Sequence, residues 1–220
     1  MDRFEEAFRS AVSVNEQSSI RFVTAGGSVL YFDPFRIRES RHDADFVFLT
    51  HDHFDHYSLP DIRKVQKKET IFLLPATMVS AVASIGADED HVILLNPGDK
   101  RVLYDLEIEA VPAYNVGKPF HPRANDWLGY RIATDGCTLF VPGDTDVTEE
   151  LRALKADLLF VPIGGTYTMD AEEAGAWTKE VSPEAAVPIH YGTVVGTPDM
   201  LDRFTAAVGD AVPVWPKISF

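Results

Sequence analysis

The chain has 220 residues, 45% of them hydrophobic and 25% charged, which suffices for a full core and fits one domain spanning residues 1–220. Its formal net charge is −14, from 20 lysines and arginines against 34 aspartates and glutamates. Such a surface repels phosphate backbones, so nucleic acid is disfavoured as a partner and a small-molecule substrate is favoured.

The first half of the chain predicts one amphipathic helix followed by strands and helices. Phe4 and Phe8 recur at helical spacing near the start. Gly26-Gly27 is the clearest hairpin signal in the sequence, because it separates two apolar stretches. The expected elements are a helix over 2–12, strands over 19–24, 28–33, 44–50 and 71–74, and helices over 59–68 and 75–85.

The second half predicts further strands and then a regular alternation of helices and strands. The expected elements are strands over 101–104, 106–112, 128–133, 138–142, 157–162, 185–190 and 212–215, and helices over 147–155, 170–180 and 198–208. Early hairpins followed by strand–helix alternation are typical of an α/β protein with two mixed sheets and helices outside them.

Cys137 is the only cysteine in the sequence, which excludes an internal disulfide and a thiolate-rich zinc site. Within an apolar strand we expect it to be a small buried hydrophobe. No apolar run approaches the roughly 20 residues of a membrane span. The acidic start, Met1 to Glu6, is unlike a signal peptide. We therefore expect a cytoplasmic protein without a membrane partner, and the sequence leaves its oligomeric state open.

The segment after the strand at 44–50 concentrates potential metal ligands. Three of the seven histidines and two aspartates lie within the six positions 51–56. Imidazoles and carboxylates bind zinc, iron and manganese. On an irregular turn, His51 and His53 can point one way while Asp55 and His56 point another, so one loop can serve two ions. The alternative is a solvated polar loop, but the density of ligands directly after a buried strand favours metal binding.

His51-x-His53-x-Asp55-His56 resembles the signature of the metallo-β-lactamase superfamily. The resemblance extends to the strand end at 31–35, to the Gly-Asp-Thr turn at 142–146 and to the late histidine segment at 189–192. Residues 162–169 carry a narrower resemblance, to small metal-dependent hydrolases related to ascorbate-6-phosphate lactonase. The resemblance implies a four-layer αββα sandwich, in which two mixed β-sheets carry helices on their outer faces.

The resemblance also implies a two-metal site. His51 and His53 would hold the first divalent ion, and Asp144 would lie between the two ions. The second ion would be held by Asp55, His56 and His190. We expect Zn²⁺, with Mn²⁺ or Fe²⁺ as alternatives.

One position departs from the family pattern. Related chains carry a histidine where this chain has Asn115, and an amide is a poor zinc ligand. His121 is the obvious substitute, and a histidine on a surface loop is the alternative interpretation. Whether His121 or Asn115 completes the first site stays open at this point.

Other side chains are candidates for supporting roles. Asp33 and Asp146 are expected to orient ligand imidazoles by accepting hydrogen bonds, unless they are ordinary turn aspartates. Trp127 is expected to serve the core. His42 and His91 are expected to be solvated loop residues. The candidates for substrate contact, which could instead pack under loops, are Tyr114, Asn115, Tyr167, Met169 and Tyr191.

The predicted chemistry is hydrolysis. Two divalent ions can share a hydroxide, because they lower the pKa of a bound water towards about 7. We expect this nucleophile to attack an ester, lactone or phosphoester in a small molecule, with Asp55 orienting it and passing a proton to the leaving group. The alternatives are a nuclease or RNA-processing phosphodiesterase of the same fold, an iron-dependent redox enzyme, and a metal-binding module without catalysis.

Overall fold

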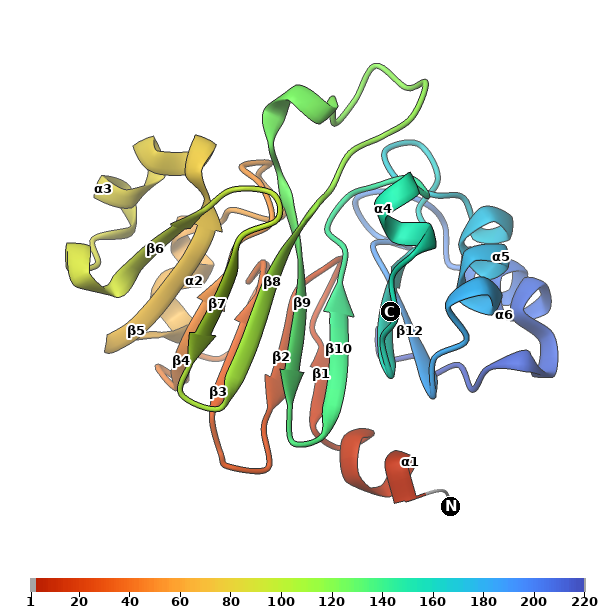
Figure 1. Ribbon diagram of the computed structural model, residues 1–220, viewed down its shortest axis with the longest axis horizontal. Coiled ribbons are helices and arrows are strands. Elements are labelled where there is room, and N and C mark those ends of the chain that lie inside the picture. Colours follow the sequence, from red (N-terminus) through yellow and green to blue (C-terminus); the bar gives the residue numbers. More distant parts are fainter. Residues whose placement is uncertain (1–2, 220) are drawn as a thin grey trace.

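The computed structural model describes residues 3–219 and contains two six-stranded β-sheets packed face to face (Figure 1). The strands of the first sheet, in spatial order, are β1 (Val12–Val14), β2 (Ile20–Val23), β3 (Val29–Phe32), β4 (Ala44–Phe48), β5 (Gln66–Pro75) and β6 (Val92–Leu95). Those of the second sheet are β12 (Ala185–Ile189), β11 (Leu158–Pro162), β10 (Cys137–Val141), β9 (Leu128–Thr134), β8 (Leu106–Pro112) and β7 (Lys100–Leu103).

Both sheets are mixed. The strands β1 to β3 pair antiparallel, whereas β3 to β6 pair parallel. In the second sheet β7 to β10 are antiparallel, whereas β10, β11 and β12 are parallel. The helices are α1 (Arg3–Phe8), α2 (Leu59–Val65), α3 (Val82–Ile85), α4 (Glu149–Arg152), α5 (Ala171–Val181) and α6 (Met200–Val208). Among the described residues, none of these helices combines the length and apolarity needed to cross a bilayer.

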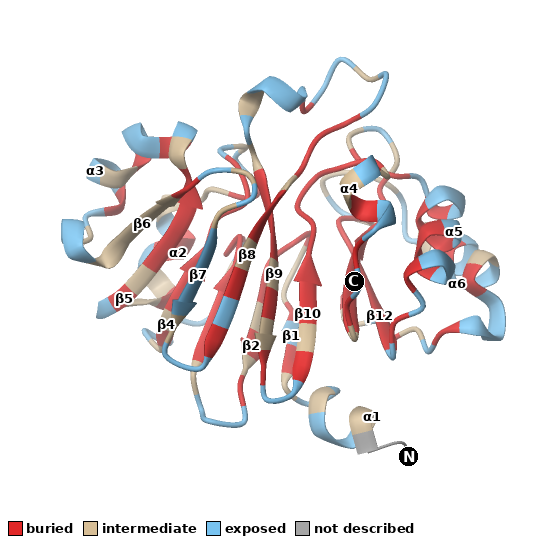
Figure 2. Cartoon of the chain, in the orientation of Figure 1, coloured by how far each residue is buried: buried red, intermediate tan, exposed pale blue. Residues whose placement is uncertain are grey.

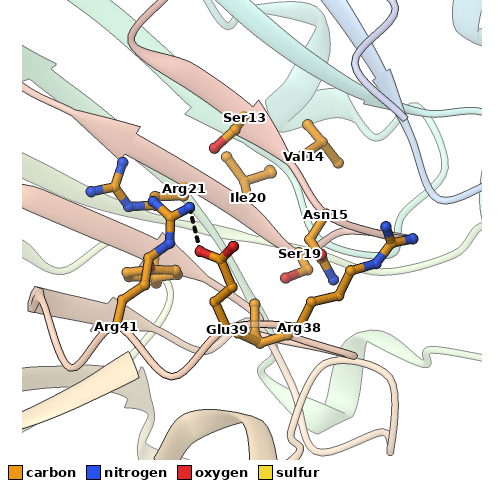
Figure 3. Close-up of a pocket in the computed structure, with 11 residues that line it drawn as sticks. Ser13, Val14, Asn15, Ser19, Ile20, Arg21, Arg38, Glu39 and Arg41 are labelled. Carbon is orange, nitrogen blue, oxygen red and sulfur yellow. Dashed lines mark hydrogen bonds and ion pairs between the residues drawn. The ribbon is translucent and has the colours of Figure 1, made fainter. Parts of the chain in front are cut away.

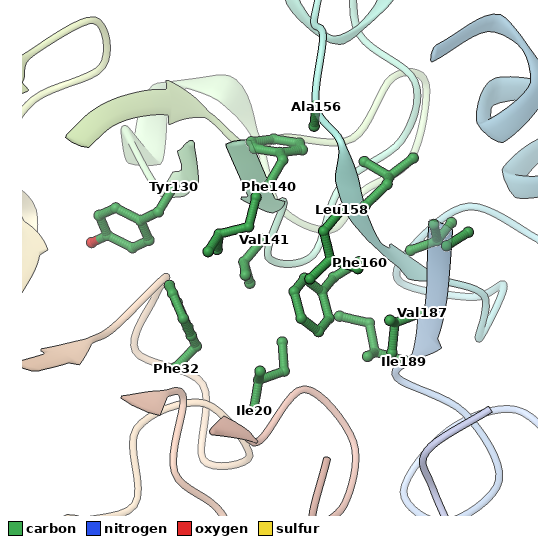
Figure 4. Packing of buried hydrophobic residues seen from close by; sticks show 14 of the residues in the cluster. Ile20, Phe32, Tyr130, Phe140, Val141, Ala156, Leu158, Phe160, Val187 and Ile189 are labelled. Carbon is green, nitrogen blue, oxygen red and sulfur yellow. The ribbon is translucent and has the colours of Figure 1, made fainter. Parts of the chain in front are cut away.

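The main core lies between the two sheets. Figure 4 shows Ile20 and Phe32 of the first sheet directed towards Tyr130 and Phe160 of the second. The Phe32 and Phe48 rings stack with centroids 4.8 Å apart. The Tyr130 ring packs edge-on against Phe48 at 5.1 Å. Aromatic pairs of this kind add about 0.5–1.5 kcal/mol to the burial of their surface. The first pair lies within one sheet, whereas the Phe48–Tyr130 pair joins the two sheets.

The helices cover the outer faces. Ile62 and Val65 of α2 pack against Val47 in a second apolar cluster outside the first sheet. Trp177 of α5 packs against Phe140 outside the second sheet, and its indole nitrogen donates to the Leu151 carbonyl at 3.2 Å. Figure 2 shows buried residues concentrated in the strands and exposed ones on the outer helices and loops. The four-layer α/β architecture expected from the sequence is confirmed.

Several local predictions were wrong. The helix expected over 2–12 ends at Phe8, and residues 12–14 form β1 instead, because Val12 and Val14 face the core while Ser13 is exposed; residue 2 lies outside the described residues. The helix expected over 59–68 ends at Val65, because residues 66–68 already belong to β5. The helix expected over 75–85 is a 3₁₀ helix over Ala76–Ala81 followed by the short α3, and the helix expected over 147–155 is limited to α4. The apolar run at 92–95, for which the sequence predicted no element, is β6 and pairs parallel with β5. The strand expected over 212–215 is reduced to a single bridge between Val214 and Ala186.

The loops that follow β4, β8, β10, β11 and β12 meet at one edge of the sandwich. Leu128, at the start of β9, donates its backbone N–H to the Thr50 carbonyl after β4 at 3.1 Å. Residues 113–127 form the long loop between β8 and β9, seen at the top of Figure 1. Side chains at the ends of neighbouring strands are where sites are commonly built, and the predicted ligands lie on these loops.

Candidate metal centre

The turn after β4 divides its four predicted ligands into two groups. The backbone N–H groups of His56 and Tyr57 both donate to the His53 carbonyl, at 2.9 and 2.8 Å, which tightens the turn. His51 Nε2 then lies 3.2 Å from His53 Nδ1. On the other side, His56 Nε2 lies 3.7 Å from Asp55 Oδ2. The turn therefore presents His51 with His53 and, separately, Asp55 with His56.

Asp144, in the loop after β10, lies between the two groups. Its Oδ1 is 3.2 Å from His56 Nε2 and 3.1 Å from His190 Nε2. Its Oδ2 is 3.4 Å from His121 Nε2 and 4.0 Å from His51 Nε2. Each oxygen of this one carboxylate thus faces a different set of imidazoles.

The donor atoms form three compact groups within which all atoms lie within 4.8 Å of one another. The groups are His51 with His53 and His121, His51 with His56 and Asp144, and Asp55 with His56 and His190. Every residue predicted to be a ligand is therefore brought into this cluster.

Several polar atoms of the cluster are buried without a hydrogen-bond partner among the described residues. They are His56 Nε2, His121 Nε2, both ring nitrogens of His190, and Asp144 Oδ1. Leaving a buried polar atom unsatisfied costs about 1–3 kcal/mol. His56 Nε2, His121 Nε2 and His190 Nε2 converge on the Asp144 carboxylate. These three nitrogens and the carboxylate fit the coordination of divalent ions, which would satisfy them.

The surroundings of His51, His121 and Asp144 favour neutral imidazoles and an ionised carboxylate. Burial lowers the pKa of His51 well below its usual value, and the neighbouring His56 adds to this. Burial likewise lowers the pKa of His121 to about 4. Burial alone would raise the pKa of Asp144, but His190 and His56 outweigh it and hold that pKa well below its usual value. Metal ligands must be deprotonated, so these three groups are ready to bind an ion.

Asp33 fixes the orientation of His56. The residue follows β3 and is fully buried, and its Oδ1 accepts a hydrogen bond from the Thr50 N–H at 2.8 Å. Its Oδ2 accepts from the Thr50 hydroxyl at 2.6 Å and lies 2.7 Å from His56 Nδ1. Asp33 therefore stands where the sequence placed it, against a candidate ligand imidazole. A carboxylate in this position fixes the ring and its tautomer.

His121, rather than Asn115, presents its side chain to the cluster. The loop closes on itself, because the Asn115 N–H donates to the His121 carbonyl at 2.8 Å. His121 is only 2% exposed, so it is not a histidine on a solvated loop. The Asn115 amide nitrogen donates to the Tyr167 carbonyl at 2.8 Å. Its amide nitrogen also lies 3.4 Å from His121 Nδ1, which places Asn115 behind the imidazole.

Comparisons with known proteins assign this geometry to a family. The model described as the beta-lactamase superfamily domain matches residues 22–191. The chain belongs to the metallo-β-lactamase superfamily. It is similar to the UPF0173 protein of Pyrococcus furiosus, with 34% identity over 176 residues that cover 76% of this chain and 77% of the relative. The superfamily expected from the sequence is therefore confirmed.

Two further proteins extend the comparison. The UPF0173 metal-dependent hydrolase of Staphylococcus carnosus is 28% identical over 201 residues, which cover 83% of this chain and 85% of the relative. The solved structure of a protein from Parabacteroides distasonis, assigned as a metal-dependent hydrolase, is similar with a TM-score of 0.78 and 25% identity. That match covers 94% of this chain and 93% of the other. The similarity to the Parabacteroides distasonis protein therefore spans nearly the whole chain.

The other residues considered in the sequence have different surroundings. Asp146 contacts no imidazole among the described residues; it accepts from the Val116 N–H at 2.9 Å and pairs with Lys118, which holds the long loop. His42 is exposed, with Nδ1 3.0 Å from the Gln66 carbonyl, and neither it nor His91 belongs to the cluster.

The five candidates for substrate contact differ in how deeply their side chains are buried. Met169 and Tyr191 are fully buried in the main core, which favours packing over substrate contact. Tyr114 is buried and its hydroxyl donates to Glu150 at 2.8 Å. Tyr167 is partly exposed, and its ring centroid lies 6.3 Å from that of His121. With Asn115 behind His121, Tyr167 is the candidate that opens towards the cluster.

Trp127 contributes to the site, although the sequence suggested a core role. Its partly exposed ring packs against the rings of His51, His53 and His121, with centroids 4.8, 4.9 and 5.3 Å away. The sequence signal for this role was that Trp127 lies at the end of the loop that carries His121. Gly164 packs against the backbone that carries His190, since a Cβ at this position would lie 2.3 Å from the His190 carbonyl oxygen.

Proposed function

We propose that this chain is a hydrolase that uses two divalent ions to cleave an ester, lactone or phosphoester in a small molecule. The observation that carries the proposal is the arrangement around Asp144, whose two oxygens face separate sets of buried imidazole nitrogens. The relatives named as metal-dependent hydrolases support the same class of activity.

The donor groups suggest how the ions are shared. His51, His53 and His121 would hold the first ion, and Asp144 would contact both. Asp55, His56 and His190 would hold the second. Three imidazoles with a further open position suit catalytic zinc, whereas Mn²⁺ and Fe²⁺ are alternatives for the carboxylate-containing group.

When bound, the ions would activate water and polarise the carbonyl or phosphoryl group under attack. Asp55 is the group of the chain best placed to handle the proton. Burial alone would raise its pKa, but His190 and His56 outweigh burial and lower it, so the carboxylate is ionised. Its Oδ2 lies 3.5 Å from His190 Nε2 and its side chain remains 8% exposed, more than that of Asp144. Asp55 can therefore orient the attacking water, accept its proton and deliver that proton to the leaving group.

The test is elemental analysis of protein purified without chelators, followed by assays on lactones, carboxylic esters and phosphodiesters. We expect two divalent ions per chain and hydrolysis that chelation abolishes and added zinc restores. Protein that neither binds divalent ions nor hydrolyses any of these substrates would overturn the proposal. Tight, salt-sensitive RNA binding would favour a phosphodiesterase acting on nucleic acid, which the charge of −14 opposes. Tightly bound iron with redox activity would favour the iron-dependent redox enzyme.

A further inference from the structure

Exposed apolar side chains gather beside the metal cluster. Phe54 stands between His53 and Asp55 in the ligand-bearing turn, yet it is 66% exposed. Val116, next to Asn115, is 59% exposed, and Phe120, next to His121, is 38% exposed. Among the described residues only three other large hydrophobic side chains are exposed, namely Val79, Val102 and Tyr104. Half of these exposed side chains therefore lie next to residues of the cluster in the sequence, where a bound substrate would cover them.

Two of these side chains are fixed by aromatic contacts. The Phe120 ring packs edge-on against Tyr167 with centroids 4.6 Å apart. The Phe54 ring is held edge-on at 6.0 Å from Phe35. The Trp127 ring, at the end of the long loop, packs against the histidines. We call these exposed and partly exposed side chains the apolar rim; its members are Phe54, Val116, Phe120, Tyr167 and Trp127.

The loops around the cluster offer no free cation among the described residues. The loops over 49–58, 142–148, 163–170 and 190–197 contain no lysine or arginine. In the long loop, Lys118 pairs with Asp146 and donates to the Thr168 carbonyl at 2.7 Å, and Arg123 pairs with Glu150 at 2.8 Å. Arg36, in the loop after β3 beside Phe35, pairs with Glu16. A phosphate or carboxylate on a substrate would therefore find only lysine and arginine side chains that are already paired on these loops.

The arginines that line a hollow elsewhere on the protein do not add a cation to the cluster. That hollow lies on the outer face of β1 to β3, and no residue of the cluster lines it (Figure 3). Arg21 pairs with Asp43 at 2.7 Å, and Arg41 pairs with Glu39 at 3.0 Å. Figure 3 shows Arg38 directed away from the other two arginines. The hollow therefore contains no converging set of cations for an anionic group.

We propose, on the basis of the function proposed above, that the substrate is an uncharged ester or lactone whose apolar chain lies on the apolar rim. The rim would take the chain while the carbonyl group faces the ions. In the reaction the oxygen of water bonds to the carbonyl carbon and the bond from that carbon to the alkyl oxygen breaks. One proton of the water passes to the alkyl oxygen, and the products are an acid and an alcohol.

The apolar rim predicts how the rate depends on chain length. Full burial of one methylene improves binding about fourfold, so a chain on a half-open surface should gain about twofold per methylene. We therefore expect kcat/KM for 4-nitrophenyl esters to rise at least about tenfold from acetate to octanoate. The 4-nitrophenyl monoester of octanedioic acid, with a carboxylate at the chain end, should lose most of that gain. Equal kcat/KM for all three esters would overturn the inference.

Matched variants locate the effect. Phe54→Ser and Phe120→Ser should each lower the ratio of octanoate to acetate kcat/KM by roughly threefold or more, which corresponds to one to two buried methylenes. Val102→Ser is the control, because Val102 is 73% exposed on β7 and distant in the fold from the rim. A ratio that falls equally in the Val102→Ser variant would contradict the placement of the chain on the rim.

A binding measurement separates this inference from the proposed hydrolysis. Octanamide and acetamide are uncharged, and calorimetry can compare them on the metal-loaded and the chelator-treated protein. We expect octanamide to bind at least about tenfold more tightly in both, and Phe120→Ser to remove most of the difference. If no ester is hydrolysed but this preference appears, the proposed hydrolysis fails while the apolar rim stands. If esters are hydrolysed, but octanamide binds no more tightly than acetamide and kcat/KM does not depend on chain length, the apolar rim is contradicted while the proposed hydrolysis stands.

Discussion

His56 and His190 lie on one side of Asp144 and are held by buried backbone and carboxylate contacts. His190 follows β12 directly and donates its N–H to the Gln17 carbonyl at 3.0 Å, while Asp33 fixes the ring of His56. The opposite side depends on the long loop. His121 comes from the long loop, and His51 and His53 pack against Trp127, which is itself partly exposed.

The difference between the two sides shows how a metal ligand can come from another sequence position than in related chains. The Asn115 N–H donates to the His121 carbonyl, so the long loop folds back and brings residue 121 beside Asn115, close to the end of β8. A loop of this shape lets His121 present its imidazole beside the position where related chains are expected to carry theirs. A strand-end ligand such as His190 has no equivalent freedom, because its backbone continues a paired strand. We therefore expect the His56 side to hold its ion more firmly than the His121 side.

The largest effect is expected from Asp144→Asn, which alters the one side chain shared by both sides. The amide keeps one oxygen, replaces the other with an NH₂ group and removes the negative charge that faces both His56 and His121, so both ions should be lost. Elemental analysis should give less than one ion per chain, with activity reduced at least about 100-fold. Asp135→Asn, in the hairpin between β9 and β10, is the control and should keep two ions.

The next effect concerns the firmly held side alone. His56→Ala and His190→Ala should each remove the same ion, because both nitrogens face Asp144 Oδ1. Each variant should lose one ion per chain, and the double variant should lose no more. Loss of two ions in the double variant would show that the two histidines serve different sites.

The loop-held side is tested by His121→Ala. Removing a direct ligand should weaken the first ion by roughly tenfold or more, since loss of a mere supporting contact already costs 10–100-fold. Competition with a fluorescent zinc chelator measures the affinity, and activity should recover partly in excess zinc. His42→Ala and His91→Ala are controls outside the cluster and should bind both ions normally. Unchanged affinity in His121→Ala would leave the first site with two histidines.

A smaller effect is expected from Trp127→Leu. The variant removes ring contacts to three histidines but no ligand atom. Aromatic contacts of this kind contribute about 0.5–1.5 kcal/mol, which corresponds to less than about tenfold in affinity. The first ion should weaken by that amount, whereas the second should not change. Equal weakening of both ions would contradict the difference between the two sides.

The smallest effect is expected at Cys137, remote from both sides in β10. Burial raises the pKa of its thiol to about 12, so the thiol stays protonated and unreactive at neutral pH. Folded protein should resist alkylation by iodoacetamide, and Cys137→Ala should retain metal content and activity. Rapid alkylation with loss of activity would show that this part of the second sheet opens in solution.

The sequence predicted the architecture well where a pattern was local. The alternating and apolar runs placed most strands of both sheets, and the density of ligands at 51–56 marked the turn after β4. The short strand β1 was missed, because Phe4, Ala7, Phe8 and Ala11 recur at helical spacing and carried the predicted helix to residue 12. It forms a strand because β2 pairs with it, which is a non-local contact.

The candidate site was predictable in its residue types but not in its contacts. Asp33 and Asp146 looked alike in sequence, yet one binds an imidazole and the other binds Lys118. The difference depends on which loop lies opposite each carboxylate, and chain order alone does not give that. Trp127 was missed for the same reason, because its contacts to His51 and His53 cross between the two sheets.

The proposed two-metal site requires that Asp144 be shared by both ions. Crystals of the protein loaded with zinc can be measured at the zinc absorption edge. We expect two anomalous peaks, one on each side of the Asp144 carboxylate and each about 2.0–2.2 Å from its nitrogen and oxygen ligands. A single peak, or peaks that avoid Asp144, would contradict the two-metal site.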